Sequence, residues 1–66
     1  MKNTIKMERA IAGLTQEELA KKVSVSRQTI NAIELNKYVP STLLALKVAQ
    51  VFNKKVEEIF TLEATD

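Results

Sequence analysis

The chain has 66 residues and a formal net charge of +2, and it contains neither cysteine nor histidine. Its length allows one domain, residues 1–66, with a small core, and the missing side chains exclude disulfides, thiolate metal sites and imidazole catalysis. No apolar run has membrane-spanning length, and the start of the chain lacks the continuous apolar stretch of a signal peptide. We therefore expect a cytoplasmic protein that is not an enzyme and needs no cofactor or metal.

Charge is unevenly distributed along the chain. Residues 57–66 contain four acids and no base, which leaves ten bases against four acids in residues 1–56. A basic domain suits a polyanionic partner. Many small soluble proteins show some unevenness of this kind, so charge alone leaves both interpretations open.

The composition of the whole chain is typical of an all-helical protein, with one Gly, one Pro and many Ala, Leu, Lys, Glu and Val residues. A first helix is expected over residues 4–12, ended by Gly13 in the left-handed conformation. The residues expected on its inner side are Ile5, Met7 or Glu8, Arg9 and Ala12.

The stretch TQEE predicts the start of a second helix. Thr15 is followed three residues later by Glu18, which is the pattern of a capping box. The helix should run from Gln16 to about Val23. The residues expected to face inward are Leu19, Ala20 and Val23.

Only SVS separates this helix from the next one. Ser26 is a good N-cap for a third helix that reaches Leu35, with Ile30 and Ile33 on its buried side. Two helices joined by about three residues must cross at a steep angle, which is the helix-turn-helix geometry. In the connection that follows, Asn36 is the residue best able to adopt a positive φ.

The last part of the chain predicts two more helices. Ser41 is expected to cap a fourth helix over residues 42–52, and a short fifth helix is expected over residues 56–60. Thr61 and Leu62 are passable strand formers, so the tail could pair as a strand with residues 2–4.

The stretch LTQEELAKKVSVSRQTINAIELNKYVPS resembles the helix-turn-helix core of the Cro/C1-type, or XRE-family, transcriptional regulators. The resemblance covers about residues 5–60 and is closest to compact members that lack a separate ligand-binding domain. It implies an all-α, five-helix, lambda-repressor-like DNA-binding domain with its helix-turn-helix at about residues 16–35. The family usually has glycine where this chain has Ser24, and a left-handed serine there would cost ~1 kcal/mol.

The family resemblance also implies which residues contact DNA. In this fold the start of the third helix enters the major groove, where an arginine can bond guanine O6 and N7 and a glutamine can bond adenine N6 and N7. Base reading is therefore expected from Arg27, Gln28, Thr29 and Asn31. Contacts to the DNA backbone are expected from Gln16, Ser26, Asn36, Lys37 and Tyr38.

These assignments have ordinary alternatives. The first turn of the third helix could simply be solvated, Tyr38 could be a packed ring that covers that helix, and Lys21 and Lys22 could be solvated charges. By resemblance, Arg9 and Glu34 are expected to form a structural ion pair rather than a catalytic one.

One recognition helix reads too few base pairs to be selective within a genome. We therefore expect a homodimeric repressor on double-stranded DNA, spanning two halves of a palindromic operator ~34–36 Å apart, with no membrane or small-molecule ligand. The dimer-interface candidates, whose alternative role is core or scattered surface, are Leu43, Leu46, Val51, Phe60 and Leu62. The alternative function is an antitoxin or protein-interaction module with the same fold.

Overall fold

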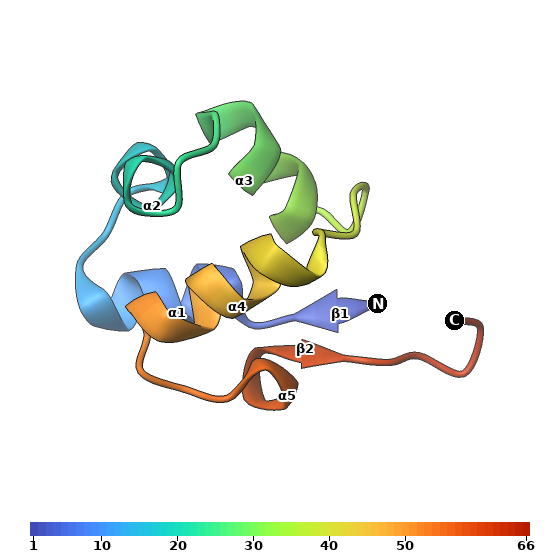
Figure 1. Ribbon diagram of the computed structural model, residues 1–66. Coiled ribbons are helices and arrows are strands. Elements are labelled where there is room, and N and C mark those ends of the chain that lie inside the picture. Colours follow the sequence, from blue (N-terminus) through green and yellow to red (C-terminus); the bar gives the residue numbers. More distant parts are fainter.

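The computed structural model describes residues 1–66 as five helices and a two-stranded antiparallel sheet (Figure 1). The elements in chain order are β1 (Lys2–Asn3), α1 (Ile5–Ala12), α2 (Gln16–Lys22), α3 (Arg27–Glu34), α4 (Thr42–Val51), α5 (Val56–Ile59) and β2 (Phe60–Thr61). The expected all-α class with a short terminal β-pairing is confirmed. None of the helices has the length and apolar character needed to cross a membrane.

Local signals in the sequence decide where the helices begin. The capping box of α2 is present, since Thr15 Oγ1 accepts from the Glu18 N–H at 3.0 Å and Glu18 Oε1 accepts from the Thr15 N–H at 2.9 Å. The side chains of Ser26 and Ser41 cap the N-termini of α3 and α4, where each accepts a hydrogen bond from the backbone N–H three residues later. Gly13 follows α1 with a φ of 71°, as expected of a residue without a Cβ.

Three residues other than glycine are left-handed: Ser24 with φ 62°, Asn36 with φ 60° and Asn53 with φ 53°. Each lies just beyond the end of a helix, where it turns the chain. Asparagine tolerates this conformation through local hydrogen bonding, whereas serine is less suited to it. The turn between α2 and α3 therefore carries local strain.

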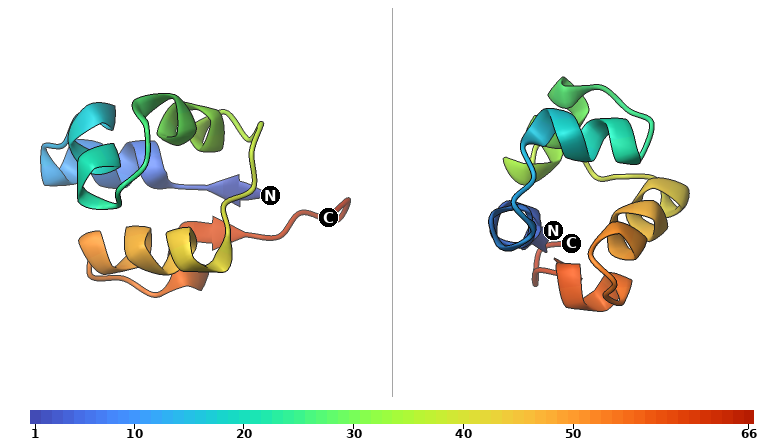
Figure 2. Two further views of the ribbon diagram at one scale, coloured as in Figure 1. Left: turned by 45° about the horizontal axis from the view of Figure 1, so that its top comes forward. Right: turned by 90° about the vertical axis from the view of Figure 1, so that its left-hand side faces the viewer.

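Figures 1 and 2 place α2 and α3 together at one end of the molecule, with α1, α4 and α5 beneath them and both chain ends on the same side. One core joins the two layers. Its buried residues are Ile5, Leu19, Ala20, Val23, Ile30, Ile33, Leu44, Val48, Ala49, Ile59 and Phe60. The terminal sheet closes this core from below, with Lys2 opposite Thr61 and Asn3 opposite Phe60.

The structure corrects one expectation for α1 and decides between two alternatives. Ala12, expected on the inner side, is exposed, whereas Arg9 is partly buried and donates from Nη1 to the carbonyl oxygen of Leu14 at 3.0 Å. Of the two alternatives for the middle of the helix, Glu8 is buried and Met7 is exposed. Burial of a carboxylate requires a partner, and Lys54 supplies it from the other end of the chain at 2.6 Å.

The ends of α3, α4 and α5 also differ slightly from expectation. The third and fourth helices each stop one residue early, before Leu35 and Phe52. Phe60, expected to end the fifth helix, instead begins β2 in an extended conformation. Its ring remains in the core, because residues paired in this strand still alternate between the inside and the surface.

Candidate nucleic-acid interface

The first turn of α3 presents two long polar side chains to solvent. Ser26 caps the helix, and the buried positions Ile30 and Ile33 turn its opposite face outward. Arg27 and Gln28 are exposed at the start of that outward face. The side chain of Gln28 makes no hydrogen bond within the protein, so both ends of its amide are available to a partner.

Thr29 is less available than its neighbours. Its side chain is partly buried, and its hydroxyl group lies 2.9 Å from the hydroxyl of Ser26. The Ser26 oxygen also accepts from the backbone N–H of Thr29 at 3.1 Å. Both hydroxyl groups are therefore engaged in shaping the start of α3.

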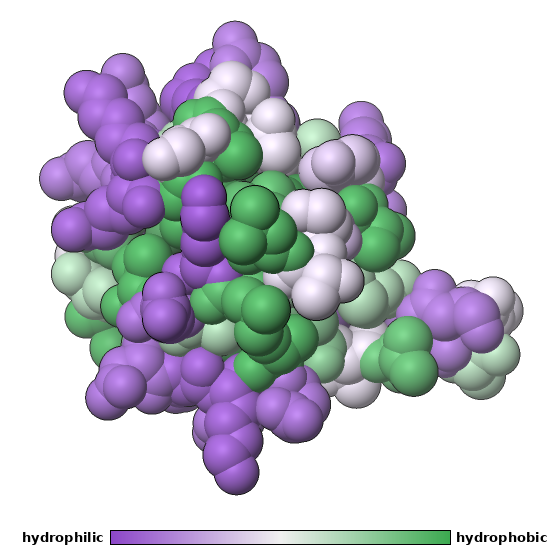
Figure 3. All heavy atoms as spheres, in the orientation of Figure 1, coloured by the Kyte–Doolittle hydropathy of each residue, from purple (hydrophilic) through white to green (hydrophobic).

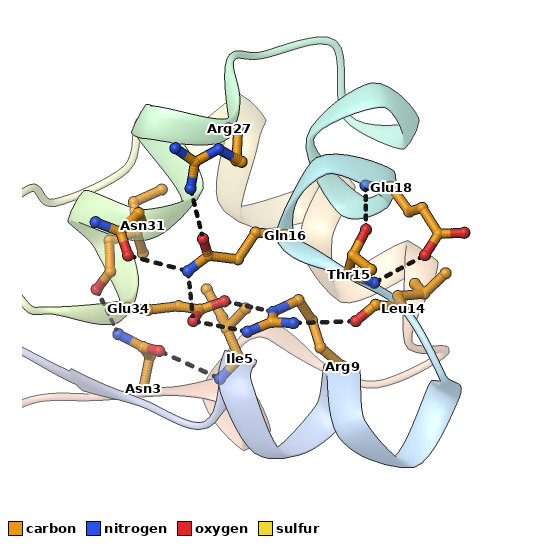
Figure 4. Close-up of polar contacts among 11 residues, drawn as sticks. Asn3, Ile5, Arg9, Leu14, Thr15, Gln16, Glu18, Arg27, Asn31 and Glu34 are labelled. Carbon is orange, nitrogen blue, oxygen red and sulfur yellow. Dashed lines mark hydrogen bonds and ion pairs between the residues drawn. The ribbon is translucent and has the colours of Figure 1, made fainter.

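Gln16, the first residue of α2, bridges to α3 through both ends of its amide (Figure 4). Its Nε2 donates to Asn31 Oδ1 at 3.0 Å and to Glu34 Oε1 at 3.1 Å. Its Oε1 accepts from Arg27 Nη1 at 3.3 Å. Because an amide nitrogen carries two hydrogens, the side-chain amide of Gln16 has no donor left for a phosphate in this arrangement, and it braces α3.

Arg9 and Glu34 join α1 to the end of α3. Arg9 donates from Nε to Glu34 Oε2 at 2.6 Å and from Nη2 to Glu34 Oε1 at 3.0 Å. The hydrogen bond to Glu34 is the main cause that raises the pKa of Arg9 above its usual value, and it outweighs the opposing effect of burial. Together with Gln16, the pair makes a continuous polar link from α1 through α3 to α2.

Asn3 is a positioning residue that sequence reasoning missed. From β1, its Nδ2 donates to the carbonyl oxygen of Ile33 at 2.8 Å and to Asn36 Oδ1 at 3.1 Å. Its Oδ1 accepts from the N–H of Ile5 at 3.2 Å. An asparagine two residues before a helix is a common local signal for this last bond, but nothing in the sequence indicates that the same amide reaches α3.

The loop after α3 carries the remaining backbone-contact candidates. Asn36, Lys37 and Tyr38 are all exposed, and the oxygen of Asn36 is held by Asn3, which leaves its nitrogen unused. Tyr38 borders a cleft between the α2–α3 turn and α4, which Lys47 also lines. The tyrosine ring is thus half-exposed rather than fully packed over α3.

The dimer-interface candidates divide into two groups. Leu43, Leu46 and Leu62 are exposed, whereas Phe60 is only 7% exposed and Val51 packs partly buried against the core. Both residues contribute to the core, and Phe60 also lines the groove beside Leu46, so their role at a dimer interface stays a prediction. A groove of about 360 Å³ lies beside Leu46, and its apolar lining includes Met1, Val39, Pro40, Ala45, Leu46 and Val56.

Known proteins provide a further comparison. The sequence profile described as helix-turn-helix matches residues 5–59. A protein of Methanocaldococcus jannaschii, named an HTH-type transcriptional regulator, is 59% identical over 63 residues, which is 96% of each chain. The regulator YgzD of Bacillus subtilis is 52% identical over the same share of both chains. A third HTH-type regulator, from Archaeoglobus fulgidus, is 51% identical over 96% of this chain and 90% of the relative.

Proposed function

This chain belongs to the helix-turn-helix family, in agreement with its resemblance to XRE-type regulators, and we propose that it is a sequence-specific DNA-binding regulator of transcription. The observation that carries the proposal is the exposed first turn of α3, where Arg27 and Gln28 keep hydrogen-bonding groups unused by the protein. In helix-turn-helix proteins this turn reaches base edges in the major groove. Arg27 suits guanine and Gln28 suits adenine.

Positioning on the duplex comes from contacts that flank α3. Lys37 supplies a positive charge, and Asn36 supplies an amide nitrogen with no protein partner, from the loop that follows α3. Such contacts to phosphates fix register and orientation without reading sequence. Gln16 supports base reading indirectly, because it holds Arg27, Asn31 and Glu34 of α3 in place.

We further propose that two copies act together as a repressor on a palindromic operator. Dimer formation is favoured by the apolar surface around the groove. Leu46 is 52% exposed there, and Val39 and Pro40 line the same groove. Figure 3 shows hydrophobic residues gathered across the middle of the face that carries α4, with hydrophilic residues around them. Burying such a surface between copies removes apolar area from water, and binding to two half-sites requires the two α3 helices of the dimer to lie about one DNA turn apart.

DNA recognition is tested by selection from a pool of random duplexes, followed by equilibrium binding to the best duplex and to a scrambled one across a salt series. We expect tight binding to the selected duplex that Arg27→Ala and Gln28→Ala each weaken by about 1–3 kcal/mol. Gln50→Ala, which removes an exposed glutamine from α4, is the matched control and should leave selectivity unchanged. Equal, weak and steeply salt-dependent binding to both duplexes would contradict the proposal.

Assembly is tested by sedimentation equilibrium over a range of protein concentrations. The wild-type protein should form dimers, and Leu46→Glu should shift it to monomers, because a charge would be placed in the apolar interface. Ile11→Glu is the matched control, since Ile11 is 74% exposed on α1 and does not line the groove. A selected motif without inverted symmetry, together with a monomeric wild type, would rule out the dimer on a palindrome.

A further inference from the structure

The three charged residues of the network around Gln16, which are Arg9, Glu34 and Arg27, determine the direction of the hydrogen bonds in it. The guanidinium of Arg9 can only donate, and the carboxylate of Glu34 can only accept. The side of the Gln16 amide that faces Glu34 Oε1, at 3.1 Å, must therefore be the nitrogen. Its oxygen then faces Arg27, which can only donate and does so at 3.3 Å.

This order extends to Asn31. The second hydrogen on Gln16 Nε2 points to Asn31 at 3.0 Å, so the Asn31 atom that receives it must be the oxygen. Its nitrogen, with two hydrogens, has no partner in the protein. Figure 4 shows this nitrogen on the side of the amide turned away from Gln16. A rotation that exposed the oxygen instead would bring two donor nitrogens together.

Asn31 lies one helical turn after Arg27, on the same face of α3. A free asparagine recognises adenine through two bonds, donating to N7 and accepting from the N6 amino group. Here the accepting oxygen is turned towards Gln16. We propose that Asn31 acts as a donor-only reader, which selects a base whose major-groove edge offers an acceptor and no amino donor, guanine or thymine, and rejects cytosine, whose edge offers only a donor.

The inference rests on the proposed function, because it names the class of base that one residue of the same interface reads. It also distinguishes Asn31 from Gln28. The side chain of Gln28 makes no hydrogen bond within the protein and can present either end of its amide to a base. The two amides on one helix are therefore expected to differ in selectivity, although both side chains carry the same functional group.

The test begins with the duplex selected by the wild-type protein. Repeating the selection with Asn31→Ala identifies the base pair that Asn31 reads, because only that position should lose its preference. Binding is then measured with each of the four base pairs at that position. The wild type should prefer guanine or thymine over cytosine by about tenfold. Gln28→Ala is the control and should alter a different position.

Two further variants test the role of hydrogen-bond direction. Asn31→Asp presents only acceptors, so its preference should move to cytosine, whose N4 amino group donates. Gln16→Met removes the constraint at similar size, so the freed Asn31 amide should accept adenine as well. Circular dichroism should show that both variants remain folded, and Asn31→Asp alone suffices if Gln16→Met does not fold.

Other outcomes would overturn the inference. Strict wild-type selection of adenine, lost when the base is replaced by purine without its 6-amino group, would show that the Asn31 oxygen faces the DNA. An Asn31→Ala variant that changes no position would show that Asn31 does not read a base. If the wild type enriches no motif at all, the proposed function fails and this inference fails with it, a result distinct from the other two.

Discussion

Arg9 and Glu34 face each other across α1 and α3, and both oxygens of the Glu34 carboxylate accept a hydrogen bond from the Arg9 guanidinium, at 2.6 and 3.0 Å. The side chains are only 14% and 6% exposed, respectively. Two parallel bonds between planar groups fix orientation as well as distance. The pair therefore sets how α3, which carries the proposed base-reading residues, is held on the rest of the domain.

Removal of Arg9 should be strongly destabilising. Arg9→Met leaves the Glu34 carboxylate buried with Gln16 as its remaining partner, and breaking a buried pair in this way typically costs about 3–5 kcal/mol. Urea denaturation measures the change in the free energy of unfolding. Arg9→Lys keeps the charge but cannot form two parallel bonds, so its loss should be intermediate. An Arg9→Met variant as stable as the wild type would show that the pair contributes nothing to stability.

A second ion pair, between Glu8 and Lys54, joins α1 to the turn after α4. Glu8 is buried, and Lys54 Nζ lies 2.6 Å from its Oε2. Lys54→Met should lower the midpoint of thermal unfolding, because the buried carboxylate loses its charged partner. Lys55→Met removes the neighbouring lysine, which is in no ion pair, and should have a smaller effect. Equal effects of the two substitutions would contradict a specific role for the pair.

Replacing Ser24 by glycine should stabilise the protein. The φ of 62° at Ser24 is unfavourable for a residue with a Cβ, so Ser24→Gly should raise the free energy of unfolding by about 0.5–1 kcal/mol after allowance for the greater freedom of glycine in the unfolded chain. Asn53→Gly, at a similar φ of 53°, should gain less because asparagine already tolerates this region. Chemical denaturation of both variants measures the difference, and a larger gain at Asn53 would refute the explanation.

The capping box at the start of α2 should make stability depend on acid pH. Hydrogen bonds from Thr15, first from its backbone N–H, hold the pKa of Glu18 below its usual value of 4.5. In acid the unfolded chain therefore binds a proton before the folded chain does, so this stabilisation is present above about pH 4.5 and is lost as the pH falls through the folded-state pKa. Unfolding measured from pH 6 downwards (a range of about three units) should show a smaller decline for Glu18→Gln than for the wild type.

The matched control for this experiment is Glu17→Gln. Glu17 is the neighbouring acid in the first turn of α2 but is outside the capping box. Its substitution removes the same charge without removing the bonds to Thr15. If both variants flattened the pH profile equally, the dependence would reflect general charge repulsion rather than the capping box.

Most of the secondary structure was predictable because its signals are local. The capping box at Thr15, the serine caps at Ser26 and Ser41, and the glycine after α1 each act within about four residues of the helix end that they define. Helical spacing correctly placed most of the core. The errors occurred at helix ends, mostly by one residue, where competing pairings, such as that of Phe60 in β2, decide the outcome.

The composition of the free apolar surface was less predictable. Helical spacing groups Leu46 and Val51 with other apolar residues of α4, but it does not tell which of them α5 and β2 will cover. The structure leaves Leu46 exposed and packs Val51 and Phe60 against or within the core. Exposure depends on all the elements that surround a side chain, so it follows from packing rather than from spacing alone.

The sequence by itself determined the helices, the steep crossing of α2 and α3 and the outward position of Arg27 and Gln28, because these follow from periodicity, capping and a short connection. Only the tertiary structure decided that Gln16 donates both amide hydrogens within the protein and that the side-chain nitrogen of Asn31 has no protein partner. It also decided that Glu8 is buried and paired with Lys54. The physical reason is that hydrogen-bond direction depends on which groups meet. Arg9 and Glu34 are 25 positions apart, and Glu8 and Lys54 are 46 apart, so their meeting is set by how the helices pack.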